Sequence, residues 1–196
     1  MNMVTDQKKN NSEKPDSIIV GVTGHRDIDK EQKLQLKTKV CEILSEIKNN
    51  NSDSRVVVMS GMAIGADMIC AEAAIEMNCT LSAALPMEVS EFRKDFSAED
   101  VQDFDRLIAQ TDEIFSVTEC FSDKLPRTSY YVKLGEYLVE HSNILLALWD
   151  GDEKHCLPGG TTDVVRMAHE KNKKDAEGFG DKKSSLTILN IVVQRA

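Results

Sequence analysis

Positive charge is scarce in this sequence. Its 196 residues include 24 Lys and Arg against 33 Asp and Glu, which gives a formal net charge of −9 and a pI near 5.0. Proteins that hold a phosphate backbone along their surface do so mainly through clustered Lys and Arg. The charge balance therefore predicts no extended nucleic-acid surface, although it is compatible with a local basic pocket.

Paired cysteines and long apolar runs are absent too. The five cysteines are scattered and contain no CxxC pair; they are Cys41, Cys70, Cys79, Cys120 and Cys156. This pattern is typical of reduced thiols rather than of disulfides or a metal site. The sequence shows no signal peptide and no apolar run of about 18 residues, the length that spans a bilayer. We expect a cytoplasmic protein with no bound metal and no membrane span within this chain.

Length and composition indicate one globular domain, since 41% of the residues are hydrophobic and a chain of this size can bury a sizeable core. Residues 1–16, MNMVTDQKKNNSEKPD, are polar and aperiodic. They predict a disordered N-terminal tail. Residues 17–196 contain no repeat and are interpreted as a single ligand-binding domain.

Within residues 17–196, β-branched apolar runs alternate with amphipathic stretches. Strands are expected at 17–22, 55–60, 80–85, 113–117, 143–149 and 186–193, and helices at 29–49, 66–77, 87–111, 130–141 and 161–171. The charged segment 170–183 is expected to form a loop. The alternation predicts an α/β, Rossmann-like fold with an open, mostly parallel sheet, right-handed crossovers and helices on both faces.

Three loops carry glycines directly after an apolar strand and directly before a helix. They are GVTGHRD (21–27), SGMAIGAD (60–67) and WDGDEKHCLPGGTTD (149–163). In a doubly wound sheet such loops lie along one edge, where backbone N–H groups and helix N-termini can bind an anion. Each glycine alone can equally serve an ordinary turn. Together the three loops favour a ligand site.

Two of these loops resemble known motifs. Residues 60–74, SGMAIGADMICAEAA, resemble the SGxAxGxDxxAxxxA signature of the DprA/Smf DNA-processing proteins, and Pro158-Gly-Gly-Thr161 resembles the PGG segment of the LOG nucleoside phosphoribohydrolases. The chain thus resembles the Rossmann-like SLOG superfamily over roughly residues 17–195. Within it, GVTGHRDI, WDG and PGGTTDVV look closest to the SLOG sensor domains of bacterial anti-phage defence effectors.

The resemblance to these sensor domains implies a nucleotide-derived ligand, such as a cyclic nucleotide or an ADP-ribose derivative, and no other cofactor. It also implies an attached or associated effector that the ligand controls. We expect the chain to self-associate, because a compact sensor can transmit binding by changing how its copies pack.

The resemblance to LOG hydrolases raises an enzymatic alternative, a nucleoside 5′-monophosphate phosphoribohydrolase. LOG enzymes carry PGGxGTxxE, in which the glutamate assists cleavage of the N-glycosidic bond. Here Thr162, Asp163 and Arg166 replace the second-block Gly, Thr and Glu. The missing glutamate favours a sensor without catalysis, unless Asp163 or Glu136 reaches the reacting atom. The acidic balance disfavours the DNA-processing alternative.

The candidate ligand-binding residues come from the three loops and the helix at 130–141, and no catalytic residue is assigned. They are Gly21, Thr23, Gly24, His25, Arg26, Ser60, Gly61, Ala63, Gly65, Asp67, Tyr130, Glu136, Trp149, Gly159, Gly160, Thr161 and Thr162. Arg26 ranks first because a guanidinium suits bidentate phosphate recognition. The alternative is a surface arginine paired with Asp27 or Asp29.

Other candidates have an equally plain structural role. His25 either donates to a phosphate or holds the loop backbone, and Ser60 either binds ligand or caps a turn. Asp67 either binds ligand or organises the start of its helix. Trp149 either stacks on a base or ribose face or is a buried wall residue, and either Tyr130 or Tyr131 can stack on a nucleobase. The family resemblance places Glu136 on a helix that borders the ligand, where it can accept from ribose hydroxyls.

Overall fold

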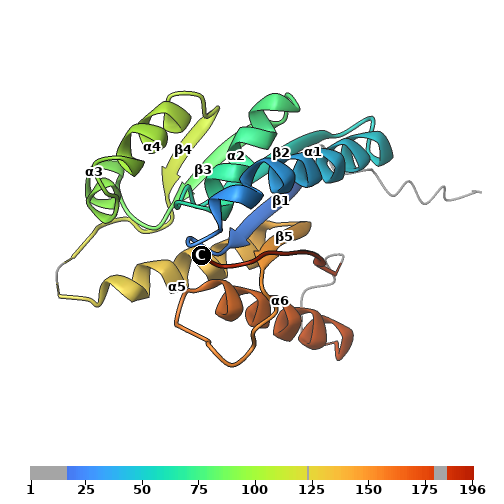
Figure 1. The fold of residues 1–196 in the computed structure, drawn as a ribbon. Helices are drawn as coiled ribbons and strands as arrows, with labels where there is room; N and C mark the ends of the chain where they lie inside the picture. The colour runs from blue at the N-terminus through green and yellow to red at the C-terminus, as the bar shows by residue number, and fades with distance from the viewer. Residues whose placement is uncertain (1–16, 123, 179–184) are drawn as a thin grey trace, which may run out of the picture.

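A single six-stranded parallel sheet runs through the protein (Figure 1). The computed structural model describes residues 17–122, 124–178 and 185–196, so the tail predicted for residues 1–16 lies outside the described residues. The strands are β1 (Ser17–Gly24), β2 (Arg55–Ser60), β3 (Thr80–Leu85), β4 (Glu113–Ser116), β5 (Ile144–Trp149) and β6 (Thr187–Val192). Their order is β4-β3-β2-β1-β5-β6, with every neighbouring pair parallel. The expected α/β, Rossmann-like fold is confirmed.

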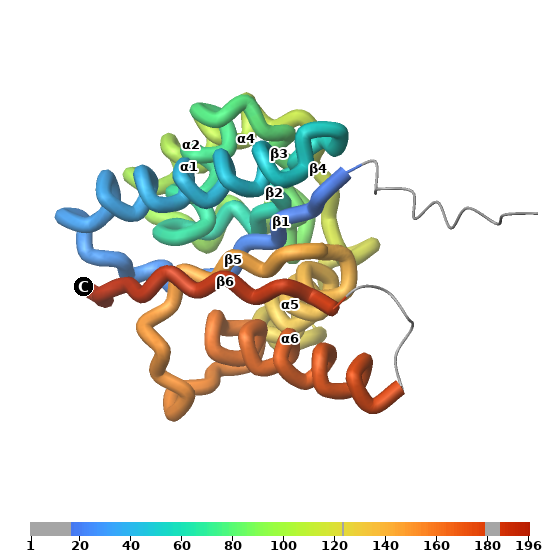
Figure 2. The backbone as a smooth tube through the Cα atoms, turned by 90° about the vertical axis from the view of Figure 1, so that its right-hand side faces the viewer, coloured from blue at the N-terminus to red at the C-terminus, as the bar shows by residue number. Residues whose placement is uncertain are grey.

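Helices cover both faces of this sheet. They are η1 (Lys30–Gln32), α1 (Lys33–Asn50), α2 (Ala66–Glu76), α3 (Val89–Phe92), η2 (Arg93–Asp95), α4 (Asp100–Ile108), α5 (Arg127–His141) and α6 (Thr161–Ala176). Figure 2 shows α1, α2 and α4 on one side of the strands and α5 and α6 on the other. No helix within the described ranges is both long and apolar enough to cross a bilayer.

Periodic burial explains why these helices lie where they do. Helix α1 buries Leu36, Val40, Leu44 and Ile47, a spacing of three or four residues that puts them on one face of a helix. Strand β5 is buried along nearly its whole length, because helices pack on both sides of a parallel sheet and leave neither face in water.

The stretch expected as one helix at 87–111 is instead α3, η2 and α4 in succession, a correction with a non-local cause. Phe92 packs against Phe96 and Phe104 with ring centroids 5.1 and 5.7 Å apart, which requires the chain to turn back on itself. The Ser97 hydroxyl accepts a hydrogen bond from the Asp100 N–H at 3.1 Å and starts α4 anew.

Helix α6 continues to Ala176, past the end expected near Lys171, so the start of the predicted charged loop is helical. Asn172 explains the extension, since its side chain accepts from the Leu186 N–H at 2.9 Å and donates to the Leu186 carbonyl at 2.8 Å. These two bonds tie the last turns of α6 to the chain that enters β6.

Candidate functional site

A cavity of about 570 Å³ opens at the carboxyl ends of the central strands. It lies where β1 separates β2 from β5, which is the point at which the strand order reverses direction along the sheet. Ligands of open α/β sheets bind at this point because the loops on either side diverge there. The volume falls in the range of roughly 300–1,000 Å³ that small-molecule sites occupy.

Residues of all three glycine-bearing loops line this cavity together with one face of α5. The candidate residues at the cavity are Thr23, Gly24, His25, Arg26, Gly61, Ala63, Asp67, Gly159, Gly160, Thr161 and Thr162. They are far apart in sequence but meet in space, because β1, β2 and β5 are parallel and end at the same edge.

Three candidate side chains lie away from the cavity, which corrects their expected ligand roles. Tyr130 is 1% exposed, and its hydroxyl accepts from the Ser122 N–H at 2.7 Å, so it is a core residue. Trp149 is buried in the protein interior, and its indole N–H donates to Thr162 Oγ1 at 3.1 Å. Glu136 is exposed on α5 outside the cavity lining.

Three further candidates also lie outside the lining and shape the loops instead. Gly21 is inside β1, where an added Cβ would lie 2.2 Å from Ser142 Oγ. Ser60 accepts from the Met62 N–H at 3.1 Å and so caps the turn after β2. Gly65 has φ of +81°, and a Cβ there would meet the His25 carbonyl at 2.5 Å. Gly65 thus lets the second loop approach the first closely, because glycine has no Cβ and readily adopts a positive φ.

The start of α6 lies at the cavity, and no described side chain caps its first backbone N–H groups. Gly160 is the N-cap residue and provides no side-chain cap, so the first N–H groups of the helix have no intrahelical acceptor. Thr161 and Thr162, the first two residues of α6, line the cavity. Helix N-termini carry partial positive charge, so this end of the cavity is suited to an anion.

Asp163 shows how the PGG loop is held. Its carboxylate accepts from the Gly159 N–H at 2.9 Å and from Arg166 Nη2 at 2.6 Å. Asp163 is buried and lies outside the cavity lining. Its carboxylate is therefore engaged in the loop, and Arg166, at the position of the LOG glutamate, is largely exposed.

The first loop is held by a second acidic residue. His25 Nε2 lies 3.0 Å from Asp150 Oδ1, which agrees with the loop-holding alternative for His25. Burial raises the pKa of Asp150, but hydrogen bonds from the Asp152 N–H and from His25 outweigh burial and leave the pKa below its ordinary value. Asp150 thus stays ionised beside the loop.

Arg26 lies exposed at the cavity rim and has no ion pair with any residue the structure describes. The expected alternative partners are engaged elsewhere, because Asp27 pairs with Arg195 at 2.8 Å and Asp29 accepts from the Glu31 N–H at 3.0 Å. The Arg26 guanidinium lies over the Tyr131 ring, with Cζ 4.9 Å from the centroid. No carboxylate of the described residues forms a salt bridge with this guanidinium.

Asp67 is the one buried carboxyl group among the described residues that line this cavity. Its side chain is 7% exposed, and Oδ2 accepts from the Ala63 N–H at 3.1 Å. Burial raises the pKa of Asp67 to about 7, against the lowering effects of that hydrogen bond and of Arg26. Asp67 therefore changes charge near neutral pH.

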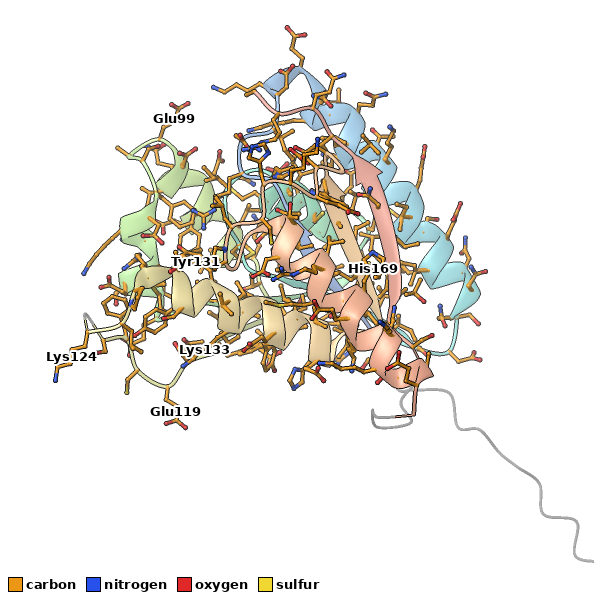
Figure 3. All side chains as sticks on the ribbon, turned by 90° about the horizontal axis from the view of Figure 1, so that it is seen from below. Glu99, Glu119, Lys124, Tyr131, Lys133 and His169 are labelled. Carbon is orange, nitrogen blue, oxygen red and sulfur yellow. The ribbon has the colours of Figure 1, made fainter. Side chains whose placement is uncertain are left out.

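Tyr131 and Arg195 also line the cavity; Tyr131 is the alternative to Tyr130 that the sequence left open for stacking on a nucleobase, and Arg195 was not predicted. Tyr131 lies on the inner side of α5, while Lys133 projects from the other side (Figure 3), and the Tyr131 hydroxyl donates to Asp95. The spacing of Tyr131, Leu134 and Leu138 marks a helix face, but Tyr130 fits the same spacing. Arg195 follows the last strand and gives no pattern signal.

Residues 195 and 196 contact the end of the first glycine-bearing loop, near the C-terminus marked in Figure 1. Ile28 and Arg195 form an antiparallel bridge, and the Ala196 N–H donates to the Asp27 carbonyl at 2.8 Å.

Within the part of the chain that the structure describes, no group of three or more His, Cys, Asp or Glu residues has the arrangement of a metal site.

Solved structures of DNA processing protein A share this fold. The X-ray structure of DprA from Streptococcus pneumoniae aligns with a TM-score of 0.54 and 16% identity, over 78% of this chain and 47% of that protein. DprA from Helicobacter pylori aligns with a TM-score of 0.51 and 17% identity, over 84% of this chain and 74% of that one. This chain therefore spans about half the length of the pneumococcal protein. No protein-family model and no curated protein sequence matches it.

These structures show a fold shared with DprA, and they carry no information on a sensor role. They also correct one expectation. The H. pylori protein is described for its single-stranded DNA binding mode, so excluding a nucleic-acid surface from the acidic balance was wrong. Net charge averages over the whole chain, whereas single strands are bound by a local groove of cations and aromatic rings.

Proposed function

We propose that this chain binds an anionic nucleotide derivative in the 570 Å³ cavity at the carboxyl edge of the sheet. The observation that carries the proposal is that the uncapped start of α6, at Thr161 and Thr162, lines the same cavity as Arg26, which has no ion pair with any residue in the described ranges. A phosphate group satisfies both the N–H groups and Arg26.

The rest of the cavity suits the remainder of a nucleotide. Phe92, Tyr131, Leu134 and Val164 form an apolar and aromatic part of the lining. Nucleobases stack on aromatic rings because every base offers a π-face. A phosphate at α6 and a base against α5 would together occupy both kinds of surface.

Several observations favour sensing over catalysis. The LOG glutamate position is Arg166, and the nearby Asp163 carboxylate is engaged by Gly159 and Arg166. Neither Asp163 nor Glu136 lines the cavity, which weighs against the phosphoribohydrolase alternative. The sequence resemblance to SLOG sensor domains supports a signal-binding role in anti-phage defence, with an effector as the output.

Single-stranded DNA binding is the second candidate function. The H. pylori protein of the same fold is described as binding single-stranded DNA, and the rim of this cavity pairs a cation with an aromatic ring, Arg26 over Tyr131. Such pairs bind single strands through stacking and phosphate contacts. The two candidates share phosphate chemistry and differ in the length of the ligand.

A thermal-shift screen followed by calorimetry tests the proposal. The probes are AMP, ADP, ADP-ribose, cyclic ADP-ribose and a dT20 oligonucleotide. A ligand at 100 times its Kd should add about 2.7 kcal/mol to stability. Binding of a mononucleotide supports the first candidate, whereas binding of the oligonucleotide alone supports the second.

Arg26→Ala then tests the anion site. Loss of a charge-assisted hydrogen bond of about 1.5–3 kcal/mol should weaken nucleotide binding roughly 10- to 150-fold. Arg26→Lys should recover part of the loss, because lysine lacks the planar fork. The charge-matched control is Arg55→Ala, at the exposed amino end of β2. Equal affinities of the Arg26 and Arg55 variants would contradict a role for Arg26.

A further inference from the structure

A buried carboxyl group is unexpected in a cavity suited to anions. Asp67 is 7% exposed and lines the same cavity as Arg26 and the start of α6. An ionised carboxylate would repel a phosphate placed against it. The ligand must therefore meet Asp67 with an uncharged hydrogen-bond donor, while its phosphate lies elsewhere.

The hydrogen bonds of Asp67 leave one oxygen available for such a donor. Oδ2 accepts from the Ala63 N–H at 3.1 Å, whereas Oδ1 accepts from no residue in the described ranges. A side chain at position 61 would crowd the carboxyl group, since a Cβ there would lie 2.9 Å from Oδ2, the oxygen that accepts from Ala63. The loop-organising role of Asp67 thus uses only half of its carboxyl group.

The position of Asp67 relative to the phosphate contacts identifies the donor. Asp67 interacts electrostatically with Arg26, the residue proposed to contact phosphate, and Arg26 in turn lies over the Tyr131 ring. In a nucleotide the sugar is the group that covalently joins phosphate to base. Sugar hydroxyls are therefore the uncharged donors nearest to the phosphate, and Asp67, which lines the same cavity as Arg26 and Tyr131, is placed to accept from one of them.

We infer that Asp67 accepts a hydrogen bond from a ribose hydroxyl, so that the site selects ribonucleotides over deoxyribonucleotides. The inference rests on the proposed nucleotide function and specifies its ligand class. It also replaces the role expected for Glu136, which is exposed and lies outside the cavity lining. Asp67 is thus a specificity-determining residue in addition to its contact with Ala63.

Calorimetry with three probes tests this inference on the wild-type protein, which removes any doubt about folding. The probes are ADP, 2′,3′-dideoxy-ADP and inorganic pyrophosphate. ADP should bind at least tenfold more tightly than its dideoxy form, because without the hydroxyl a buried polar group stays unpaired. Pyrophosphate reports the anion contacts alone.

Asp67→Asn tests whether Asp67 is the source of the preference. The amide oxygen can still accept from the Ala63 N–H, so the loop keeps its contact. The variant should bind ADP and dideoxy-ADP within about threefold of each other and should bind pyrophosphate at least as well as the wild type. A purely structural role of Asp67 would change the affinities for all three probes together.

The outcomes separate the two proposals. Equal binding of ADP and dideoxy-ADP by the wild type, or a preference that survives in Asp67→Asn, would overturn the inference and leave the nucleotide function standing. If neither nucleotide binds, the proposed function fails, and the inference fails with it.

Discussion

Replacing Asp67 by asparagine should change how the stability of the protein depends on pH. Burial raises the pKa of this carboxyl group from 3.8 to about 7 in the folded protein. The folded state therefore holds its proton more tightly than the unfolded state does. The stability associated with the protonated group is complete below about pH 4 and is lost as the pH rises toward 7.

The size of the effect follows from the difference between these two pKa values. Each pKa unit corresponds to about 1.4 kcal/mol, so the complete loss is about 4 kcal/mol. Between pH 5 and pH 8 the linkage relation gives a loss of about 2–3 kcal/mol. Asparagine does not titrate, so the free energy of unfolding of Asp67→Asn, relative to wild type, should rise by this amount over the same interval.

Urea denaturation of both proteins at pH 5, 6, 7 and 8 measures the effect, because all other titrating groups cancel in the difference. Asp27→Asn is the matched control. Despite some burial, hydrogen bonding to Arg195 keeps the pKa of Asp27 below its ordinary value, so Asp27 is ionised throughout this range. The difference in the free energy of unfolding between Asp27→Asn and the wild type should therefore stay constant. A constant difference for Asp67→Asn as well would refute the assignment of a buried carboxyl group that titrates near neutrality.

Three further variants separate the anion site from the core. Gly160→Asp places a carboxylate at the N-cap of α6, where φ is −82° and suits any residue. The new cap should raise stability by about 0.5 kcal/mol. Calorimetry should show that this variant no longer binds ADP. Gly160→Ala adds the same Cβ without the cap, so an equal loss in both variants would argue against an anion at this helix start. Tyr130→Phe removes the hydroxyl that bonds Ser122 and should cost about 1 kcal/mol in urea denaturation, with ADP affinity unchanged. Weaker ADP binding in this variant would contradict the placement of Tyr130 in the core.

The sequence pattern was sufficient to predict the sheet, because strand and helix periodicities are local properties. All six strands appear within a few residues of their predicted bounds, and the helix predicted at 161–171 differs from the observed helix only in its length. The interrupted helix at 87–111 could not be predicted in this way. Its break depends on Phe92, Phe96 and Phe104 packing together. The helical periodicity of the sequence does not reveal that these three rings meet.

The position of the candidate site was also predictable, whereas the direction of its side chains was not. Glycine-bearing loops after parallel strands meet at one sheet edge whatever their sequences. Which tyrosine of α5 faces the cavity depends on how the helix is rotated against the sheet. Leu134 and Leu138 pack with Met59 and Ala84, and this rotation turns Tyr131 toward the cavity and leaves Glu136 exposed.

The sequence by itself therefore determined the order of the elements and the loops that form the site, since both follow from short-range patterns. Only the tertiary structure decided the electrostatics of that site. Arg26 is free of ion pairs in the described structure because Arg195, from the far end of the chain, holds Asp27. Asp67 titrates near neutrality because the packing of α2 removes it from water, and the burial of a side chain depends on contacts that form only when distant segments fold together.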